Sequence, residues 1–200
     1  MINKISNNNR GPLNFLFVTD IRNNNLDFDI AGQYIEYNKI QYILIKINPL
    51  SLNLNMDMGS IVDHEICHAI QQCIFFDNTG DTIYDTDTYL SFYPKDFDFN
   101  NEENYEKYVI SEPDNVYFTD DYAMTGIIED MSKMFENAMM EEIPENMYYP
   151  HIHARFEYLC KLIRSAFNDL PLTEPLLWER VLQPKPVTSE SDTSNSGLGG

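Results

Sequence analysis

Two histidines and a glutamate lie close together in the segment DHEICHAIQ. His64 and His68 are four positions apart, and Glu65 directly follows the first of them. On a helix, side chains four positions apart point the same way, so both imidazoles can bind one metal ion while Glu65 lies beside it. Zinc lowers the pKa of a bound water toward roughly 7, and a neighbouring glutamate can take up the proton during attack on a carbonyl. The spacing therefore predicts one Zn²⁺ ion on His64 and His68, with Glu65 as general base.

A catalytic zinc site needs a third protein ligand and leaves one position for water. Four side chains further along the chain are candidates: Glu129, Glu136, His151 and His153. Glu129 is preferred because it lies in a second segment with a helical apolar stripe, so that two packed helices would face the metal together. A solvated acid near a helix N-terminus is the alternative interpretation of Glu129. Asp130, next to it, is expected to accept a hydrogen bond from a ligand imidazole.

Three helices are predicted to carry these residues. Residues 59–74, 125–140 and 151–167 each have apolar side chains at the spacing of an amphipathic helix. Thr125 is placed to cap the second of them. The helix that carries the two histidines is thus expected to pack its apolar stripe against the rest of the domain.

A small sheet is predicted before the helices. Residues 14–20 read as a strand, and residues 33–47 as a hairpin that turns at Asn38-Lys39, where asparagine tolerates a positive φ. The strand Ile40–Ile47 has two interpretations: it pairs with an extended substrate, or it lies in the core. Strands followed by helices indicate an α+β domain.

The length suits one domain, predicted over residues 14–183, between a polar segment at residues 1–13 and a disordered tail at residues 184–200. The formal net charge of −19 would repel phosphate, so no nucleic acid partner is expected. No membrane span is expected either, because no apolar run approaches the roughly 20 residues required. Three cysteines inside helical patterns favour buried thiols and a reducing compartment such as the cytoplasm, although the location stays open.

Two segments resemble a known group of enzymes. HEICHAIQ, followed by YFTDDYAMTGIIEDMSKMFENAM, is similar to the gluzincin branch of the zincin metallopeptidases. It most resembles bacterial zinc-binding peptidases that pair HExxH with a downstream Tyr-Ala-x-Thr and Glu-Asp segment. The later RFEYLCKLIRSAF segment and Trp178-Glu179 are also similar, so the resemblance covers about residues 30 to 180.

The resemblance implies a zincin-like fold. Such a fold has a twisted sheet whose edge strand lines the cleft, an active-site helix with HExxH, a second helix that supplies a glutamate ligand, and a C-terminal helix. Carried onto this chain, His64, His68 and Glu129 match the metal ligands, and Glu65 matches the general base. The chain departs from the pattern at Met131, where Arg or Lys is frequent.

Peptide hydrolysis also needs a hydrogen-bond donor for the oxyanion besides the metal. Tyr122 is the first candidate because it lies shortly before Glu129. His151 or His153 is the second candidate, and a packed aromatic side chain is the alternative interpretation of Tyr122.

The expected function is a zinc-dependent peptidase, either an endopeptidase or an aminopeptidase, acting on a peptide or protein substrate. Two alternatives remain open. One is a catalytically inactive zincin-like protein with a binding or regulatory role, whose acidic cleft takes a basic partner. The other is a domain in which His64 and His68 are surface residues that bind no metal. The substrate and the oligomeric state do not follow from the sequence.

Overall fold

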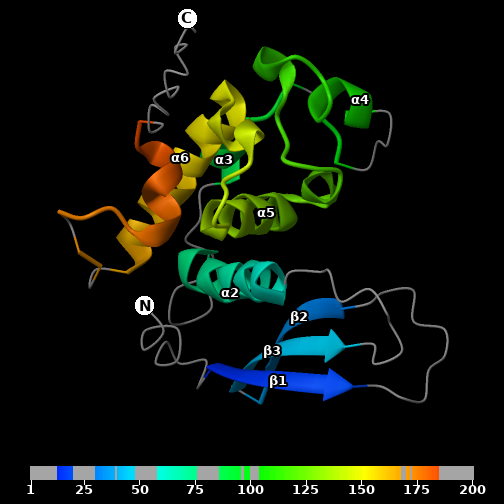
Figure 1. Ribbon diagram of the computed structural model, residues 1–200, viewed down its shortest axis with the longest axis vertical. Coiled ribbons are helices and arrows are strands. Elements are labelled where there is room, and N and C mark those ends of the chain that lie inside the picture. The colour runs from blue at the N-terminus through cyan, green and yellow to red at the C-terminus, as the bar shows by residue number, and fades with distance from the viewer. Residues whose placement is uncertain are drawn as a thin grey trace, which may run out of the picture.

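A three-stranded sheet forms one side of the computed structural model (Figure 1). Its strands are β1 (Leu13–Thr19), β2 (Ile30–Tyr37) and β3 (Ile40–Ile47). They lie in the order β1-β3-β2, with β1 parallel and β2 antiparallel to β3. The structure describes residues 13–19, 30–38, 40–47, 58–75, 86–95, 97–99, 104–167, 170–171 and 173–184. A small sheet followed by helices confirms the expected α+β class.

The turn between β2 and β3 has the backbone geometry that the sequence predicts. Tyr37 pairs with Ile40 across this turn, and Asn38 has a φ of 50°, in the left-handed region that asparagine tolerates. The predicted hairpin is therefore confirmed at Asn38, whereas Lys39 lies outside the described residues.

β3 is the middle strand of the sheet, hydrogen-bonded on both sides. Ile43 and Ile45 are fully buried beneath helix α2 (Met58–Phe75), which packs its apolar side chains onto them. Because its backbone groups are already paired, β3 has no free edge for an extended peptide. Pairing of substrate with Ile40–Ile47 is therefore a wrong prediction, and the alternative that this strand lies in the core is right.

Helix α2 lies between the sheet and the other long helices. Figure 1 shows the sheet on one side of α2 and helix α5 (Ile127–Met139) on the other. Helix α6 (Pro150–Ala166) packs against both α2 and α5. The bounds of these helices closely match the three predicted ones, because their apolar side chains do recur at helical spacing.

The start of α5 differs from its prediction. Thr125 belongs to a preceding 3-10 helix, η2 (Tyr122–Thr125), and its hydroxyl donates to the carbonyl of Tyr122. Gly126 holds the N-cap position of α5, and no side chain caps it. The prediction that Thr125 caps this helix is wrong because its hydroxyl is already used in the turn before the helix.

The core of the helical half is built around α5 and α6. Met131, Phe135 and Ala138 of α5 are buried as the apolar stripe predicts. The buried apolar residues of α6 are Ile152, Phe156, Leu159, Cys160 and Ile163. Two residues of the α5 stripe are less buried: 47% of the surface of Ile128 is exposed, and Met139 is only partly buried. Ile128 lies in the first turn of α5, beside the cleft described below.

Three short helices lie in the described part of the chain between α2 and η2. They are α3 (Thr86–Leu90), α4 (Asn104–Tyr108) and η1 (Pro113–Asn115). Two 3-10 helices lie later in the chain, η3 (Glu145–Tyr148) and η4 (Leu177–Leu182). Residues 76–85 lie outside the described part of the chain. Aromatic side chains pack together in this region, with Phe118 stacked on Tyr93 at 5.4 Å between ring centroids.

All three cysteines are free and buried, as expected for thiols in helical stripes. Among the described residues, no helix is both long enough and apolar enough to cross a membrane. The predicted polar segment 1–13 and tail 184–200 lie outside the described residues, apart from residues 13 and 184.

Candidate metal centre

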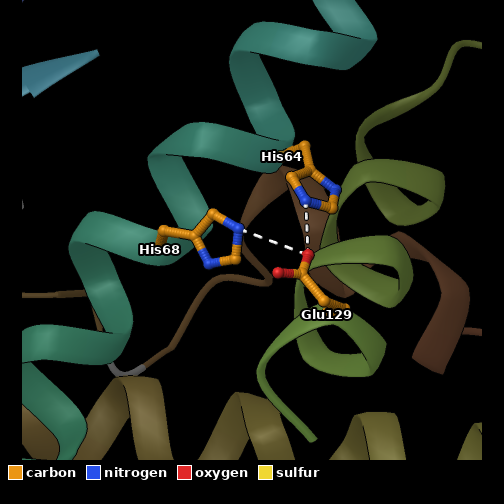
Figure 2. A group of neighbouring side chains, drawn as sticks. All are labelled: His64, His68 and Glu129. Atoms are coloured by element: carbon orange, nitrogen blue, oxygen red, sulfur yellow. Dashed lines mark hydrogen bonds and ion pairs between the residues drawn. The ribbon is translucent and has the colours of Figure 1, made fainter. Parts of the chain in front are cut away.

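His64, His68 and Glu129 come together between α2 and α5 (Figure 2). One ligand atom from each lies within 4.8 Å of the others, so the three residues form a group that could hold a metal ion. Oε2 of Glu129 is 3.1 Å from Nε2 of His64 and 3.5 Å from Nε2 of His68. The two histidines lie on one face of α2 because they are four positions apart, and α5 packs against that face. The structure thus brings together the three residues that the sequence selected.

The second ring nitrogen of each histidine has its own hydrogen-bond partner. Nδ1 of His64 lies 3.1 Å from Oε2 of Glu136, and a carboxylate can only accept, so this nitrogen carries the proton. Nδ1 of His68 lies 2.9 Å from Oε1 of Gln71. The amide nitrogen of Gln71 donates to the carbonyl of Ile128, which turns its oxygen toward His68. Both imidazoles are therefore held with Nε2 free to bind a metal.

The three groups that face each other are all electron-pair donors. A carboxylate and two Nε2 atoms without hydrogens can form no hydrogen bond among themselves. They need a proton or a cation between them. In the metal-free protein a proton meets this need: burial disfavours charge on His64, but hydrogen bonds to Glu129 and Glu136 outweigh it and raise its pKa to about 9. Burial alone would raise the pKa of Glu129, yet hydrogen bonds from both histidines hold that pKa well below its usual range.

Glu136 is one candidate third ligand that has a different place. It lies two turns beyond Glu129 along the same helix, and its carboxylate faces the far side of His64. Ser60 donates to its other oxygen, as does Nζ of Lys133 at 2.9 Å. Glu136 therefore orients an imidazole, which is the role that the sequence analysis gave to Asp130.

Asp130 does not contact either histidine. It is fully buried and forms an ion pair with Nε of Arg155, also fully buried, at 2.7 Å. The hydroxyls of Tyr93 and Tyr89 donate to the same carboxylate at 2.6 and 3.3 Å. The expected contact of Asp130 with a ligand imidazole is thus wrong, because consecutive helical residues point about 100° apart and Asp130 faces α6. Its network instead anchors the first turn of α5, next to Glu129.

The other two candidate ligands lie elsewhere. His151 stacks on the ring of Tyr117 at 3.8 Å between centroids, and its Nε2 lies 3.0 Å from the carbonyl oxygen of Asp114. Neither His151 nor His153 belongs to the group that could hold a metal. Neither histidine lines the cleft that contains Glu129, which argues against either as an oxyanion donor there.

Glu65 lies between α2 and the backbone of β2. Only 6% of its surface is exposed, and Oε2 is buried with no hydrogen-bond partner among the described residues. It packs so closely on Gly32 that a side chain there would collide with it. Burial raises the pKa of Glu65, while the nearby histidines and a hydrogen bond from the backbone of Tyr34 oppose that rise. An unsatisfied carboxylate oxygen beside His64 and His68 suits a proton acceptor.

A cleft of about 310 Å³ opens beside these residues. The side chains and backbone that line it come from β2, α2, η2 and the start of α5. They are Gly32, Gln33, Tyr34, Glu65, His68, Gln71, Gln72, Tyr122, Ile128 and Glu129. The strand that lines the cleft is therefore β2, whose other edge pairs with β3.

Tyr122 lies at the mouth of this cleft. Half of its surface is exposed, and its ring centroid is 5.8 Å from that of His64. Partial burial, the charge of Glu129 and a hydrogen bond to that carboxylate raise the pKa of Tyr122 to about 12, so its hydroxyl keeps its proton at neutral pH. Tyr122 thus presents a protonated hydroxyl close to His64 and Glu129, and its role as an oxyanion donor stays a prediction.

The sequence analysis did not single out Gln71, Gly32 or the orienting role of Glu136. The signal for Gln71 was its position one turn after His68, and for Glu136 its position two turns after Glu129. Gly32 carried no such signal, because its contact with Glu65 depends on how β2 packs against α2.

No protein-family model matches this chain, and no curated protein or solved structure is significantly similar to it. The resemblance to zincins therefore depends on the residues of the two motif segments.

Proposed function

We propose that this protein is a zinc-dependent peptidase of the zincin type. The observation that carries the proposal is that His64, His68 and Glu129 converge from two helices beside Glu65, whose Oε2 has no hydrogen-bond partner among the described residues. Two imidazoles and one carboxylate are a ligand set of catalytic zinc sites, which keep a fourth position open. The acceptors on both Nδ1 atoms further support a metal, because they leave both Nε2 atoms free.

The residues suit a water-dependent hydrolysis without a covalent intermediate. Zinc would supply Lewis acidity, polarising a carbonyl and making a water easier to deprotonate. Glu65 takes up the proton of the attacking water on Oε2, which has no partner in the part of the chain that the structure describes, and delivers it to the leaving nitrogen. Its raised pKa brings proton uptake and release closer to neutral pH.

Tyr122 supports the reaction as a hydrogen-bond donor. Its hydroxyl is protonated and lies next to Glu129, so it can donate to the oxygen on which negative charge develops. The cleft walls beside it are largely uncharged, and the residues that line them include Gln33, Gln72 and Ile128.

Zinc content tests the metal site. Elemental analysis of the purified protein is expected to find one zinc per chain, and His64→Ala and Glu129→Ala are expected to lose or weaken it. Circular dichroism checks that each variant is folded. A folded wild-type protein that takes up no zinc would refute the proposal and leave His64 and His68 as residues without a metal.

Activity on a peptide library then tests the chemistry. Glu65→Gln removes the proton acceptor with little change in volume, so it is expected to retain zinc and lose hydrolysis. Full activity of this variant would exclude the mechanism. Zinc binding without turnover in the wild type would favour the alternative of a catalytically inactive binding protein. Met131, where the resembled family often has Arg or Lys, is the sequence feature that fits this alternative.

A further inference from the structure

Lys133 is a mostly buried cation held between two carboxylates. Its side chain is 17% exposed, and its Nζ lies 2.9 Å from Oε1 of Glu136 and 3.2 Å from Oδ2 of Asp120. Burial alone would lower its pKa, but hydrogen bonds and charges from the two acids raise it, so the ammonium stays charged. Such a group is costly to bury unless both of its partners remain in place.

One end of this bridge reaches the metal group. Glu136 uses Oε2 for Nδ1 of His64, and it uses Oε1 for Ser60 and Lys133. Lys133 therefore helps to keep Glu136 ionised and in the orientation that holds the His64 ring.

The other end reaches the turn that carries Tyr122. Oδ1 of Asp120 accepts the backbone N–H of Ala123 at 2.8 Å, while Oδ2 of the same carboxylate pairs with Lys133. Asp121 accepts the backbone N–H of Tyr122 at 2.9 Å. The conformation of this turn thus depends on a carboxylate that Lys133 holds against α5.

We propose that Lys133 is a positioning residue that couples the orientation of His64 to the position of Tyr122. It does so through Glu136 on one side and Asp120 on the other, without touching the metal group itself. The role for the metal rests on the proposed function, whereas the effect on the Tyr122 turn holds for the protein with or without metal. Lys133 would then act on both the metal ligand and the oxyanion donor through a single side chain.

Hydrogen–deuterium exchange of the metal-free protein tests the turn. Lys133→Met keeps most of the side-chain volume but removes the charge, and it is expected to speed amide exchange in residues 120–125 by about tenfold or more. Lys133→Arg keeps the charge and is expected to restore slow exchange. Lys161→Met is the matched control, because Lys161 pairs with Glu157 on the exposed face of α6 and lies outside this network. Unchanged exchange in Lys133→Met would overturn the proposal, whatever the protein binds.

Zinc affinity, measured by competition with a chelator, tests the other end. Lys133→Met is expected to weaken zinc binding by roughly tenfold, in the range seen when a partner of a ligand histidine is lost. In a Glu136→Gln background the same substitution is expected to change zinc affinity much less, because Lys133 acts on His64 only through Glu136. Equal effects in both backgrounds would overturn the coupling to His64. If the wild type binds no zinc, the proposed function fails, and amide exchange alone decides the role of Lys133.

Discussion

Gly32 of β2 lies directly against the carboxylate of Glu65 on α2. A Cβ at position 32 would lie 2.5 Å from Oε1 of Glu65 and 2.7 Å from its Cγ, closer than real side chains approach. The same Cβ would lie 2.8 Å from Cγ2 of Ile61, so a larger residue at position 32 would have to displace the side chains of both Glu65 and Ile61. The strand thus fixes where the proposed general base lies.

Substitution of this glycine should separate catalysis from metal binding. Gly32→Ser is expected to retain zinc and to lower kcat by roughly 100-fold, since a displacement of about 1 Å can cost that much. Gly126→Ser is the matched control, because a Cβ there meets nothing within 4 Å and serine is favoured at an N-cap. Zinc content and steady-state kinetics of both variants check this. Unchanged kcat in Gly32→Ser would mean that Glu65 need not lie where the strand holds it.

Tyr122 offers a test of oxyanion stabilisation. Tyr122→Phe is expected to lower kcat by about 100-fold with little change in KM, because the lost hydrogen bond forms mainly in the transition state. The side chain is half exposed, so the fold should be unaffected. Tyr105→Phe, at another exposed tyrosine on α4, serves as the control. If kcat is the same in Tyr122→Phe and wild type, Tyr122 has no part in the reaction.

The stability of the metal-free protein should depend on pH through His64. Its pKa rises from 6.5 to about 9 on folding, so the folded state binds a proton that the unfolded state releases between these values. The free energy of unfolding is therefore expected to be highest below pH 6.5 and to fall by up to roughly 3 kcal/mol as pH rises through 9. Urea unfolding in chelator at several pH values measures this. In His64→Gln this loss should be absent, and an equal loss in that variant would assign it to another group.

The buried ion pair between Arg155 and Asp130 should matter for stability. Arg155→Met leaves a buried carboxylate unpaired and is expected to lower the free energy of unfolding by about 3 to 5 kcal/mol. Lys161→Met removes an exposed pair and should cost less than about 1 kcal/mol. Urea denaturation of the two variants provides the comparison. A loss below 1 kcal/mol in Arg155→Met would show that Asp130 readily takes up a proton when Arg155 is absent.

The three candidate metal ligands could be predicted because each lies in a local sequence pattern. Spacing within one helix places His64 and His68 on one face, and a second apolar stripe brings Glu129 toward them. The hairpin turn at Asn38 is local in the same sense, because it depends on the φ that a single residue tolerates.

The wrong predictions at Asp130 and β3 concern contacts between distant parts of the chain, whereas the one at Thr125 concerns a local turn. Asp130 is held by Arg155, and nothing in the periodicity of either helix indicates that pairing. Thr125 matches a capping pattern, yet a short 3-10 helix uses its hydroxyl first. The central place of β3 follows from its parallel pairing with β1, which strand composition does not reveal.

The arrangement of α2 between the sheet and α5 gives a bound ion a mechanical role as well. Its ligands lie on two elements, so it would act as a cross-link that closes the chain between His68 and Glu129 into a loop. A single backbone cut within that loop would leave two fragments joined by the ion in addition to their packing. A nicked protein should therefore stay together while loaded and separate more readily in chelator.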